Sequence, residues 1–166
     1  LIFAFASRKI PLNHISFMCG VSNDDIAIAL DKLFPLIMHE NEEYYVFHND
    51  VRLYLKRAII SSRGYLAIAL NVRDRIISEE ALGYYAYDII FSSLFEVKSD
   101  NYILDIFTSK YITDSLKYDI PLNKLVSQFA MVAQKIGEHK NLDALNNLSK
   151  VATTINQYIY CVQYYE

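Results

Sequence analysis

The stretch that decides the fold is residues 44–55, YYVFHNDVRLYL, where a strand pattern changes into a helix pattern. The aromatic and β-branched residues 44–47 predict a strand. From His48 or Asn49 onward the apolar residues follow the helical period, with Val51 and Leu55 on one face. His48 is therefore expected at the start of a helix, where outward-pointing backbone N–H groups can bind a phosphate.

Three short helices are expected before this stretch. Residues 1–6 and 12–19 have apolar helical spacing, and Gly20 is a suitable residue to end the second helix. The turn 21–25 leads into a third helix, with a capping residue and acidic side chains at its positive end. Pro35 is expected to close this helix. Its apolar face would carry Ile26, Ala29, Leu30 and Leu33.

A β-hairpin is predicted where the polar turn 40–43 separates two apolar segments, 36–39 and 44–47. The three short helices, this hairpin and the helix that begins near His48 together predict a winged helix over residues 1–62. Beyond the polar segment 61–64 no strand signal follows. The predicted fold class is therefore mainly α: a winged helix with a small β-hairpin, then an α-helical, superhelical repeat-like region at 63–166.

The second region is expected to be a stacked array of helices. The helix expected from residue 79 is apolar nearly all round, and the one at 121–137 carries two apolar stripes. Two apolar faces on one helix predict neighbours on both sides. The first stripe consists of Leu125, Phe129, Val132 and Ile136, and the second of Val126, Ala130 and Ala133. The helices are predicted near 64–76, 79–96, 100–107, 109–118, 121–137 and 141–164.

The end of the chain has an apolar stripe with no polar cap. The stripe continues to Tyr164 and Tyr165. A repeat array cut part-way would expose the face that its next helix covers. We therefore expect a truncated region with an exposed apolar end, able to bind a protein or a second copy. The stripe consists of Val151, Ile155, Ile159 and Val162.

Charge and composition disfavour several partners. The net charge is −3, from 16 basic and 19 acidic residues, whereas nucleic-acid binding needs clustered positive charge. Cys19 and Cys161 stand far apart, which predicts neither a zinc site nor a disulfide framework and suggests a reducing, cytoplasmic location. No targeting signal or membrane span is recognisable, so a membrane partner is not expected.

Catalytic motifs are missing from the sequence. It contains no GxxxxGK[ST], HExxH or GxSxG pattern, and its four histidines have no metal-site spacing. The acidic pairs 24–25 and 42–43 lie in expected turns, where solvation explains them. Cys19 lies in a short amphipathic helix, where a core position is expected. We therefore predict that the chain is not an enzyme and has no catalytic or metal-binding residues.

A winged helix raises the alternative of a transcription regulator with a helical dimerisation or effector domain. Its third helix would enter the major groove, where basic or amide side chains contact DNA. That helix offers Asp24, Asp25, Asp31 and a single Lys32, and the hairpin turn is also acidic. Repulsion from phosphate disfavours this alternative. A scaffold subunit of the proteasome-lid kind also combines helical repeats with a winged helix, but there the repeats come first.

His48 has two interpretations, a local helix cap and a phosphate contact. The pattern aromatic–His–x–x–Val–Arg–x–x–Leu, carried by Phe47 to Leu55 after the predicted winged helix, resembles the end of the nucleotide-binding module of STAND ATPases. These are the NACHT and NB-ARC receptors. In that family a histidine at this place contacts the β-phosphate of ADP and holds the receptor closed. Asn49 stands where plant members have an acidic residue, with Asp50 next to it.

The resemblance covers residues 1–60, implies tetratricopeptide-like or other superhelical sensor repeats after them, and implies a function for the whole chain. It would be a regulatory fragment of a signalling or defence ATPase, with His48 contacting the ADP phosphate only in the intact protein. The family binds ATP or ADP with Mg through a domain N-terminal to this region, so the fragment itself needs no cofactor. The implied partners are that upstream domain and either a protein ligand or a self-oligomer bound through the repeats.

Overall fold

The computed structural model describes residues 1–97 and 99–165, with side chains for these residues except 163–165. The fold is mainly α, with a small three-stranded antiparallel sheet near the N-terminus. The predicted fold class is confirmed at this level. The expected exposure of Tyr164 and Tyr165 lies outside the described side chains.

The chain forms two compact units, Leu1–Glu96 and Val97–Glu166. The boundary expected from the sequence, at 62/63, falls inside the first unit. Helix α5 packs against α2, and the helical segment after it packs against α5 and α1, which explains why these elements belong to the first unit.

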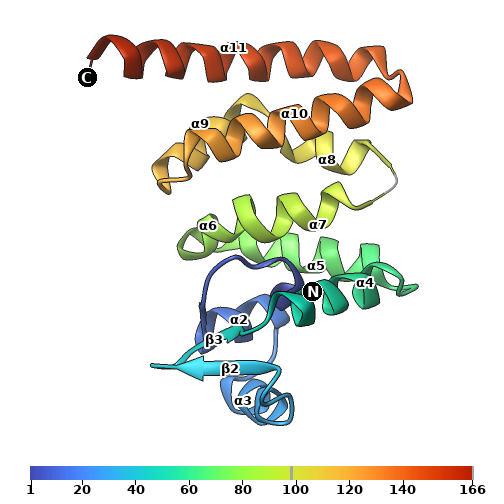
Figure 1. Cartoon of the computed structure of the whole chain (residues 1–166), viewed down its shortest axis with the longest axis vertical. Helices are drawn as coiled ribbons and strands as arrows, with labels where there is room; N and C mark the ends of the chain where they lie inside the picture. Colours follow the sequence, from blue (N-terminus) through green and yellow to red (C-terminus); the bar gives the residue numbers. More distant parts are fainter. Residues whose placement is uncertain (98, 166) are drawn as a thin grey trace. The chain divides into compact units, whose positions relative to one another are not determined.

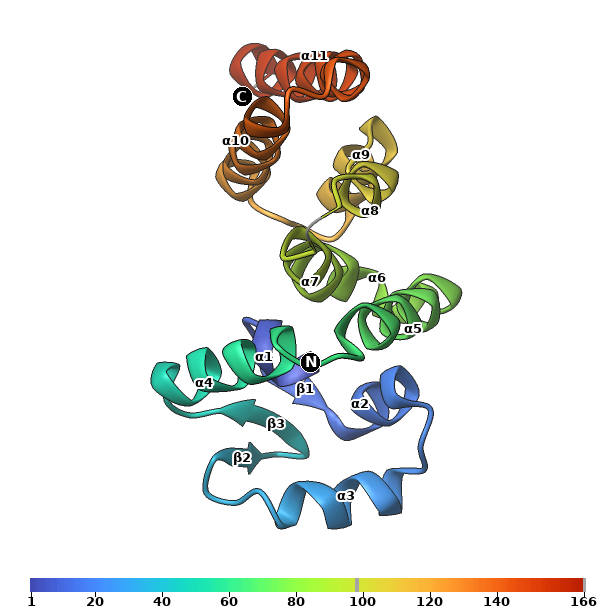
Figure 2. The same cartoon turned by 90° about the vertical axis from the view of Figure 1, so that its right-hand side faces the viewer.

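The first unit opens with a compact arrangement of short helices around the sheet (Figure 1). Its elements up to residue 60 are α1 (Ile2–Phe5), β1 (Ile10–Pro11), α2 (Leu12–Cys19), α3 (Asn23–Asp31), β2 (Ile37–Glu40), β3 (Glu43–Val46) and α4 (Asn49–Ile60). Helix α2 lies between α3 and α5 (Figure 2). The strand order is β1-β3-β2, with Ile10 opposite Tyr44 and Ile37 opposite Val46.

The helix ends in this part follow from local chemistry. Gly20 ends α2 in the left-handed conformation, with φ 68°, and its N–H donates to Ser16 and Phe17 oxygens. The guanidinium of Arg75 occupies the space that a Cβ on Gly20 would need, so a larger residue would displace this flexible side chain and would also be strained by the positive φ. Ser22 caps α3 by accepting from the Asp25 N–H at 3.2 Å.

Helix α3 ends earlier than predicted. It stops at Asp31, so Pro35 does not close it, and Leu33 lies in the following turn with 44% of its surface exposed. Leu30 is the buried residue of this helix. The prediction that Leu33 belongs to the helical face is therefore wrong. The turn residues 32–36 instead carry the chain from α3 to the hairpin.

The rest of the first unit is helical. It comprises α5 (Tyr65–Ser78), a 3₁₀ turn η1 (Glu80–Leu82), α6 (Gly83–Tyr85), a π-helical turn η2 (Ala86–Ile90) and α7 (Phe91–Phe95). The single helix predicted at 79–96 is thus several short helical types in succession. Its predicted burial is largely confirmed: Leu82, Ile89 and Leu94 are among the most buried side chains described, whereas Tyr84 and Phe95 are half-buried.

The second unit consists of α8 (Asn101–Ile106), α9 (Ser109–Lys117), α10 (Leu122–His139) and α11 (Leu142–Tyr165). Helix α11 runs antiparallel to α10 and also packs on α9 (Figure 1). Thr108 caps α9 by accepting from the Tyr111 N–H. Asn141 caps α11 by accepting from the Ala144 N–H at 3.1 Å.

The two apolar stripes predicted on α10 differ in burial. In the first stripe Leu125, Val132 and Ile136 are fully buried. In the second, Val126 is 42% exposed and Ala130 is exposed. The prediction that both faces of this helix are covered is therefore wrong, since small apolar residues are tolerated on a solvated helix face.

The stripe predicted to be exposed on α11 is largely covered. Val151 and Ile155 are buried, whereas Ile159 and Val162 are half-buried. The expected exposure is thus wrong for the first two residues, because α9 and α10 pack against this helix. The exposed apolar side chains of α11 lie elsewhere: Leu142, Leu145, Tyr158 and Tyr160.

Candidate functional site

The β2–β3 hairpin places His48 directly before a helix. Its two-residue turn, Asn41 and Glu42, has φ values of 52° and 63°, which suits the right-handed twist of the strands. Strand β3 ends at Val46, and Phe47 leaves the sheet with 60% of its surface exposed. His48 then becomes the N-cap residue of α4, with φ −104° and ψ 135°.

The His48 side chain is exposed and makes no capping hydrogen bond with the helix it precedes. Its ring stands edge-on to the Phe47 ring, with 4.7 Å between centroids and 90° between planes. The first-turn N–H groups of α4 are therefore left without a side-chain acceptor from His48. The imidazole remains available for a group outside the described chain.

Arg52 lies one helical turn after His48, on the same side of α4. Its backbone N–H donates to the His48 carbonyl at 3.2 Å, as the helix requires. Within the described residues its side-chain Nε is buried and has no hydrogen-bond partner. A buried donor left without an acceptor costs about 1–3 kcal/mol. The His48–Arg52 pair, which we call the α4 start site, is therefore one acceptor short.

The charges around the α4 start site are mixed. Asp50 lies in the first turn of α4. Its carboxylate interacts favourably with the positive end of the helix dipole but repels a second anion. Toward the other end of the helix, Lys56 forms an ion pair with Glu96 at 2.6 Å. An anion at this site would thus depend on His48 and Arg52 to offset Asp50.

A second polar cluster, missed by the sequence analysis, joins the first residues of the unit to the π-helical turn. Asp88, only 4% exposed, accepts from the Ser7 N–H at 2.6 Å and from its hydroxyl at 2.7 Å. Arg8 stacks on Tyr84 with 3.7 Å from Cζ to the ring centroid. Asp88 was detectable in the sequence as the one charged residue between 81 and 95.

Tyr85 joins the same region to α2. Its hydroxyl lies 3.1 Å from His14 Nδ1, and the two rings meet edge to face. Desolvation, together with the Glu43 charge, raises the pKa of Tyr85 to about 12. A phenol held neutral in this way binds as a structural hydrogen-bonding group rather than as a base.

Of the acidic positions predicted to be solvated, Asp24, Asp25 and Glu42 are exposed, whereas Glu43 is half-buried as the first residue of β3. Glu40 forms an ion pair with Lys9, and that hydrogen bond lowers the pKa of Glu40 and raises that of Lys9. Beside these charges lies an apolar face formed by Ile28, Leu33, Phe34 and Leu36, all 44–63% exposed.

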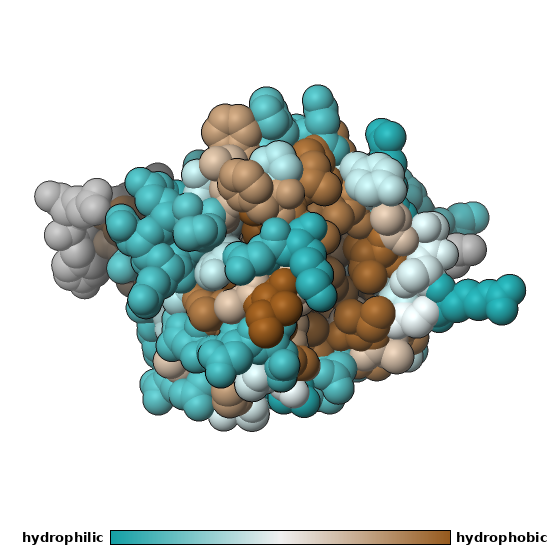
Figure 3. Space-filling model, turned by 90° about the horizontal axis from the view of Figure 1, so that it is seen from below, coloured by the Kyte–Doolittle hydropathy of each residue, from teal (hydrophilic) through white to brown (hydrophobic). Residues whose placement is uncertain are grey.

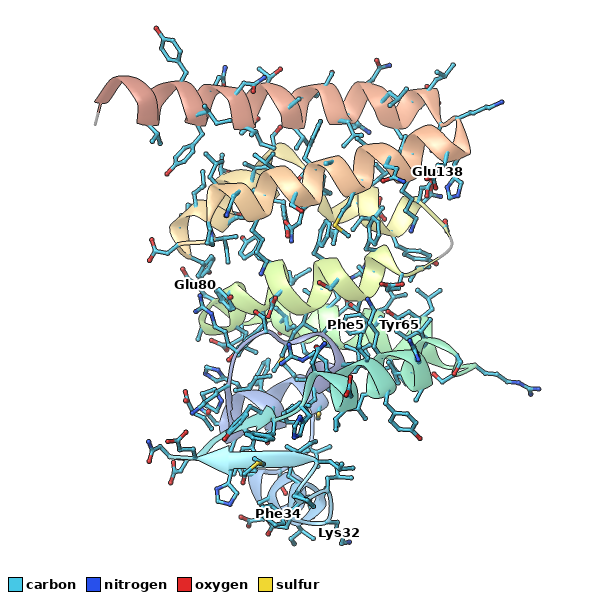
Figure 4. The ribbon with its side chains drawn as sticks, viewed as in Figure 1. Phe5, Lys32, Phe34, Tyr65, Glu80 and Glu138 are labelled. Atoms are coloured by element: carbon cyan, nitrogen blue, oxygen red, sulfur yellow. The ribbon has the colours of Figure 1, made fainter. Side chains whose placement is uncertain are left out.

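The space-filling view from below shows apolar side chains gathered among polar ones (Figure 3). Phe34 and Lys32 lie beside α3 (Figure 4). The outer surface of α3 is therefore acidic and apolar, with Lys32 as its basic residue.

The core position predicted for Cys19 is wrong. It is the last residue of α2 and is exposed. Desolvation by neighbouring groups nevertheless raises the pKa of its thiol. Among the described residues, no three His, Cys, Asp or Glu side chains gather closely enough to hold a metal ion.

The described helices include none with the length and hydrophobicity needed to cross a membrane. Comparison with family models, curated proteins and solved structures gives no match to this chain.

Proposed function

We propose that this chain is a regulatory fragment of a STAND-type signalling or defence ATPase. Residues 1–62 would form its winged helix and residues 63–166 the start of a tetratricopeptide-like sensor. In the intact cytoplasmic protein, an N-terminal domain would bind ATP or ADP with Mg. The winged helix would stabilise the ADP-bound off state, and the helical region would bind the activating protein or a second copy.

The order of elements supports the winged-helix part of this proposal. A helix, a short strand, two further helices and a hairpin succeed one another, and β1 completes a three-stranded antiparallel sheet. Helix α4 follows the hairpin directly. This arrangement fits the pattern from which the resemblance to the family was drawn.

The observation that carries the proposal is the α4 start site. The His48 side chain is exposed and makes no capping hydrogen bond, and the Nε of Arg52, one turn further along α4, is buried without an acceptor in the described chain. A phosphate oxygen would accept from the exposed imidazole directly and from the Arg52 Nε once that side chain turns to expose it, and hydrogen bonds between charged groups are the strong ones. Free N–H groups in the first turn of α4 favour the same ligand.

The helical region supports a binding role. Helices α9, α10 and α11 pack together, yet α11 keeps Leu142 at 75% and Tyr160 at 58% exposure. Large exposed apolar side chains on such helices are suited to a protein partner. These residues, rather than the stripe through Val151, are the surface we assign to partner binding.

The proposal is tested by ADP release from the intact protein. We expect His48→Ala to speed dissociation of a fluorescent ADP by about tenfold to a hundredfold, the value of one charge-assisted hydrogen bond. His39→Ala is the matched control, because His39 is exposed on β2 and outside the α4 start site. Equal release rates for both variants and the unmodified protein would reject the proposal.

A further inference from the structure

A polar groove in the first unit brings together carboxylates from two separate turns of the chain. It has a volume of about 720 Å³ and is lined by the starts of α2 and α3 and by the β2–β3 hairpin. Ligand-binding clefts of proteins typically have volumes of about 300–1,000 Å³. Asp24 lines the groove from the first turn of α3, and Glu42 and Glu43 line it from the hairpin.

The groove is negatively charged. Its described lining contains no lysine or arginine. Among the described residues, Asp24, Glu42 and Glu43 form no ion pair. Lys9 is close enough to interact with the Glu43 charge, but its ion pair is with Glu40. The three carboxylates are therefore available to a positively charged ligand.

The carboxylates are spread along the groove. Within the described part of the chain, no three His, Cys, Asp or Glu side chains gather closely enough to hold a metal ion. A single small cation would therefore contact too few of them. A ligand that matches this arrangement carries several positive charges held apart by spacers.

Tyr44 contributes a hydrogen-bonding group that the described chain does not use. The residue is 9% exposed and lines the groove, and its hydroxyl has no hydrogen-bond partner among the described residues. It lies opposite His39 in the sheet, with 5.5 Å between the two ring centroids, and His39 also lines the groove. A phenol hydroxyl can accept from an ammonium, and the aromatic ring attracts a cation.

We propose that this groove binds a linear polyamine such as spermidine, with its ammonium groups on Asp24, Glu42 and Glu43 and its methylene spacers along Tyr44 and His39. An ammonium group only donates hydrogen bonds, and carboxylates only accept them. Hydrogen bonds between charged groups are stronger than neutral ones. The inference is independent of the nucleotide switch, because His48 does not line the groove.

Isothermal titration calorimetry of the chain with spermidine tests the proposal. We expect saturable binding of one spermidine per chain. Putrescine, which has one ammonium fewer, should bind about three- to tenfold more weakly. Mg²⁺ should displace spermidine no better than NaCl of the same ionic strength, because screening alone would then act.

Substitutions in the groove test the assignment of the carboxylates and the phenol. Asp24→Asn and Glu42→Gln should each weaken spermidine binding by about three- to tenfold, and Tyr44→Phe by about two- to tenfold. Asp31→Asn is the matched control, because it removes the same charge from the same helix at an exposed position outside the groove.

The two acidic groove positions 24 and 42 are exposed, so these size-conserving substitutions should leave the fold intact. Three outcomes would each overturn the proposal. They are the absence of saturable spermidine binding, displacement by Mg²⁺ beyond the effect of ionic strength, and an equal loss of affinity in Asp31→Asn and Asp24→Asn.

Discussion

Asp88 and Ser7 are joined by two hydrogen bonds across 81 positions of sequence. The carboxylate belongs to the π-helical turn η2, and both donors belong to the loop after α1. A π-helical turn changes the direction of the following side chains and is rare outside functional or structurally constrained sites. Here it presents a buried carboxylate to Ser7, whose N–H and hydroxyl both donate to it.

We expect Asp88→Ala to lower the free energy of unfolding by about 2–3 kcal/mol, because two hydrogen bonds to a charged group are lost. Ser7→Ala removes the hydroxyl bond alone and should cost about 1 kcal/mol. Urea unfolding of the chain measures both. Asp74→Ala is the control: this carboxylate forms an exposed pair with Arg73 and should contribute about 0–1 kcal/mol. An Asp88 variant as stable as the Asp74 variant would contradict the prediction.

Alkaline pH should destabilise the first unit through Tyr85. Its pKa is about 12 when folded, raised mainly by desolvation, against 10.0 for a free tyrosine. A pKa raised by folding gives stability that is complete below pH 10 and is lost as pH rises toward 12. The loss should reach roughly 2 kcal/mol in the unmodified chain and be missing in Tyr85→Phe. Urea midpoints across this pH range test it, and parallel curves for both chains would refute it.

Local signals were sufficient for much of the secondary structure. Helix α2 begins at Leu12 and ends at Cys19 as predicted, because Pro11 and Gly20 have backbone preferences that set its ends. The hairpin and the start of α4 were also predictable, since a change of apolar period marks the boundary at His48. These features depend on residues within one or two turns of each other.

Other features depend on distant partners and could not be predicted. Strand β1 has two residues, and its partner Tyr44 lies far along the chain. The role of Asp88 depends on Ser7, and the missing acceptor of Arg52 depends on what surrounds its Nε. In the candidate site, the position of His48 at the start of α4 was therefore predictable from the sequence. That the Arg52 Nε is buried without an acceptor could be seen only in the structure.

The chain should not bind duplex DNA in a salt-sensitive manner. Asp24, Asp25 and Asp31 on α3 repel phosphate, and Lys32 alone cannot offset them. A gel shift at low ionic strength should show no sub-micromolar retention. As a control, replacing the three aspartates with lysine should create weak, salt-sensitive binding. Tight retention of the unmodified chain would favour the transcription-regulator alternative.

Replacing Arg52 should stabilise the isolated chain. Arg52→Met keeps most of the apolar stem and removes the buried donor, so the free energy of unfolding should rise by about 1 kcal/mol. Arg57→Met is the control on the same helix, because the Arg57 side chain is exposed in the last turn. Loss of its positive charge should lower the free energy of unfolding by a few tenths of a kcal/mol, roughly the value of its interaction with the helix dipole. Urea unfolding compares the two, and a loss of stability in the Arg52 variant would mean that its Nε is satisfied by water.

Two measurements distinguish a signalling role of His48 from a role in folding. Its side chain is exposed and makes no cap, so His48→Ala should leave the unfolding of the isolated chain unchanged within about 0.5 kcal/mol. In the intact protein, the imidazole contact to an ADP phosphate would exist in the closed state alone and contribute about 1.5–3 kcal/mol. Its loss should shift the open-to-closed ratio by roughly ten- to a hundredfold.

Ligand-independent signalling of the intact protein measures that shift, with His39→Ala as the matched variant on the hairpin. We expect the His48 variant to signal at rest and the His39 variant to stay silent. An isolated chain destabilised by His48→Ala, together with unchanged resting activity in the intact protein, would show that the residue acts in folding and that the switch lies elsewhere.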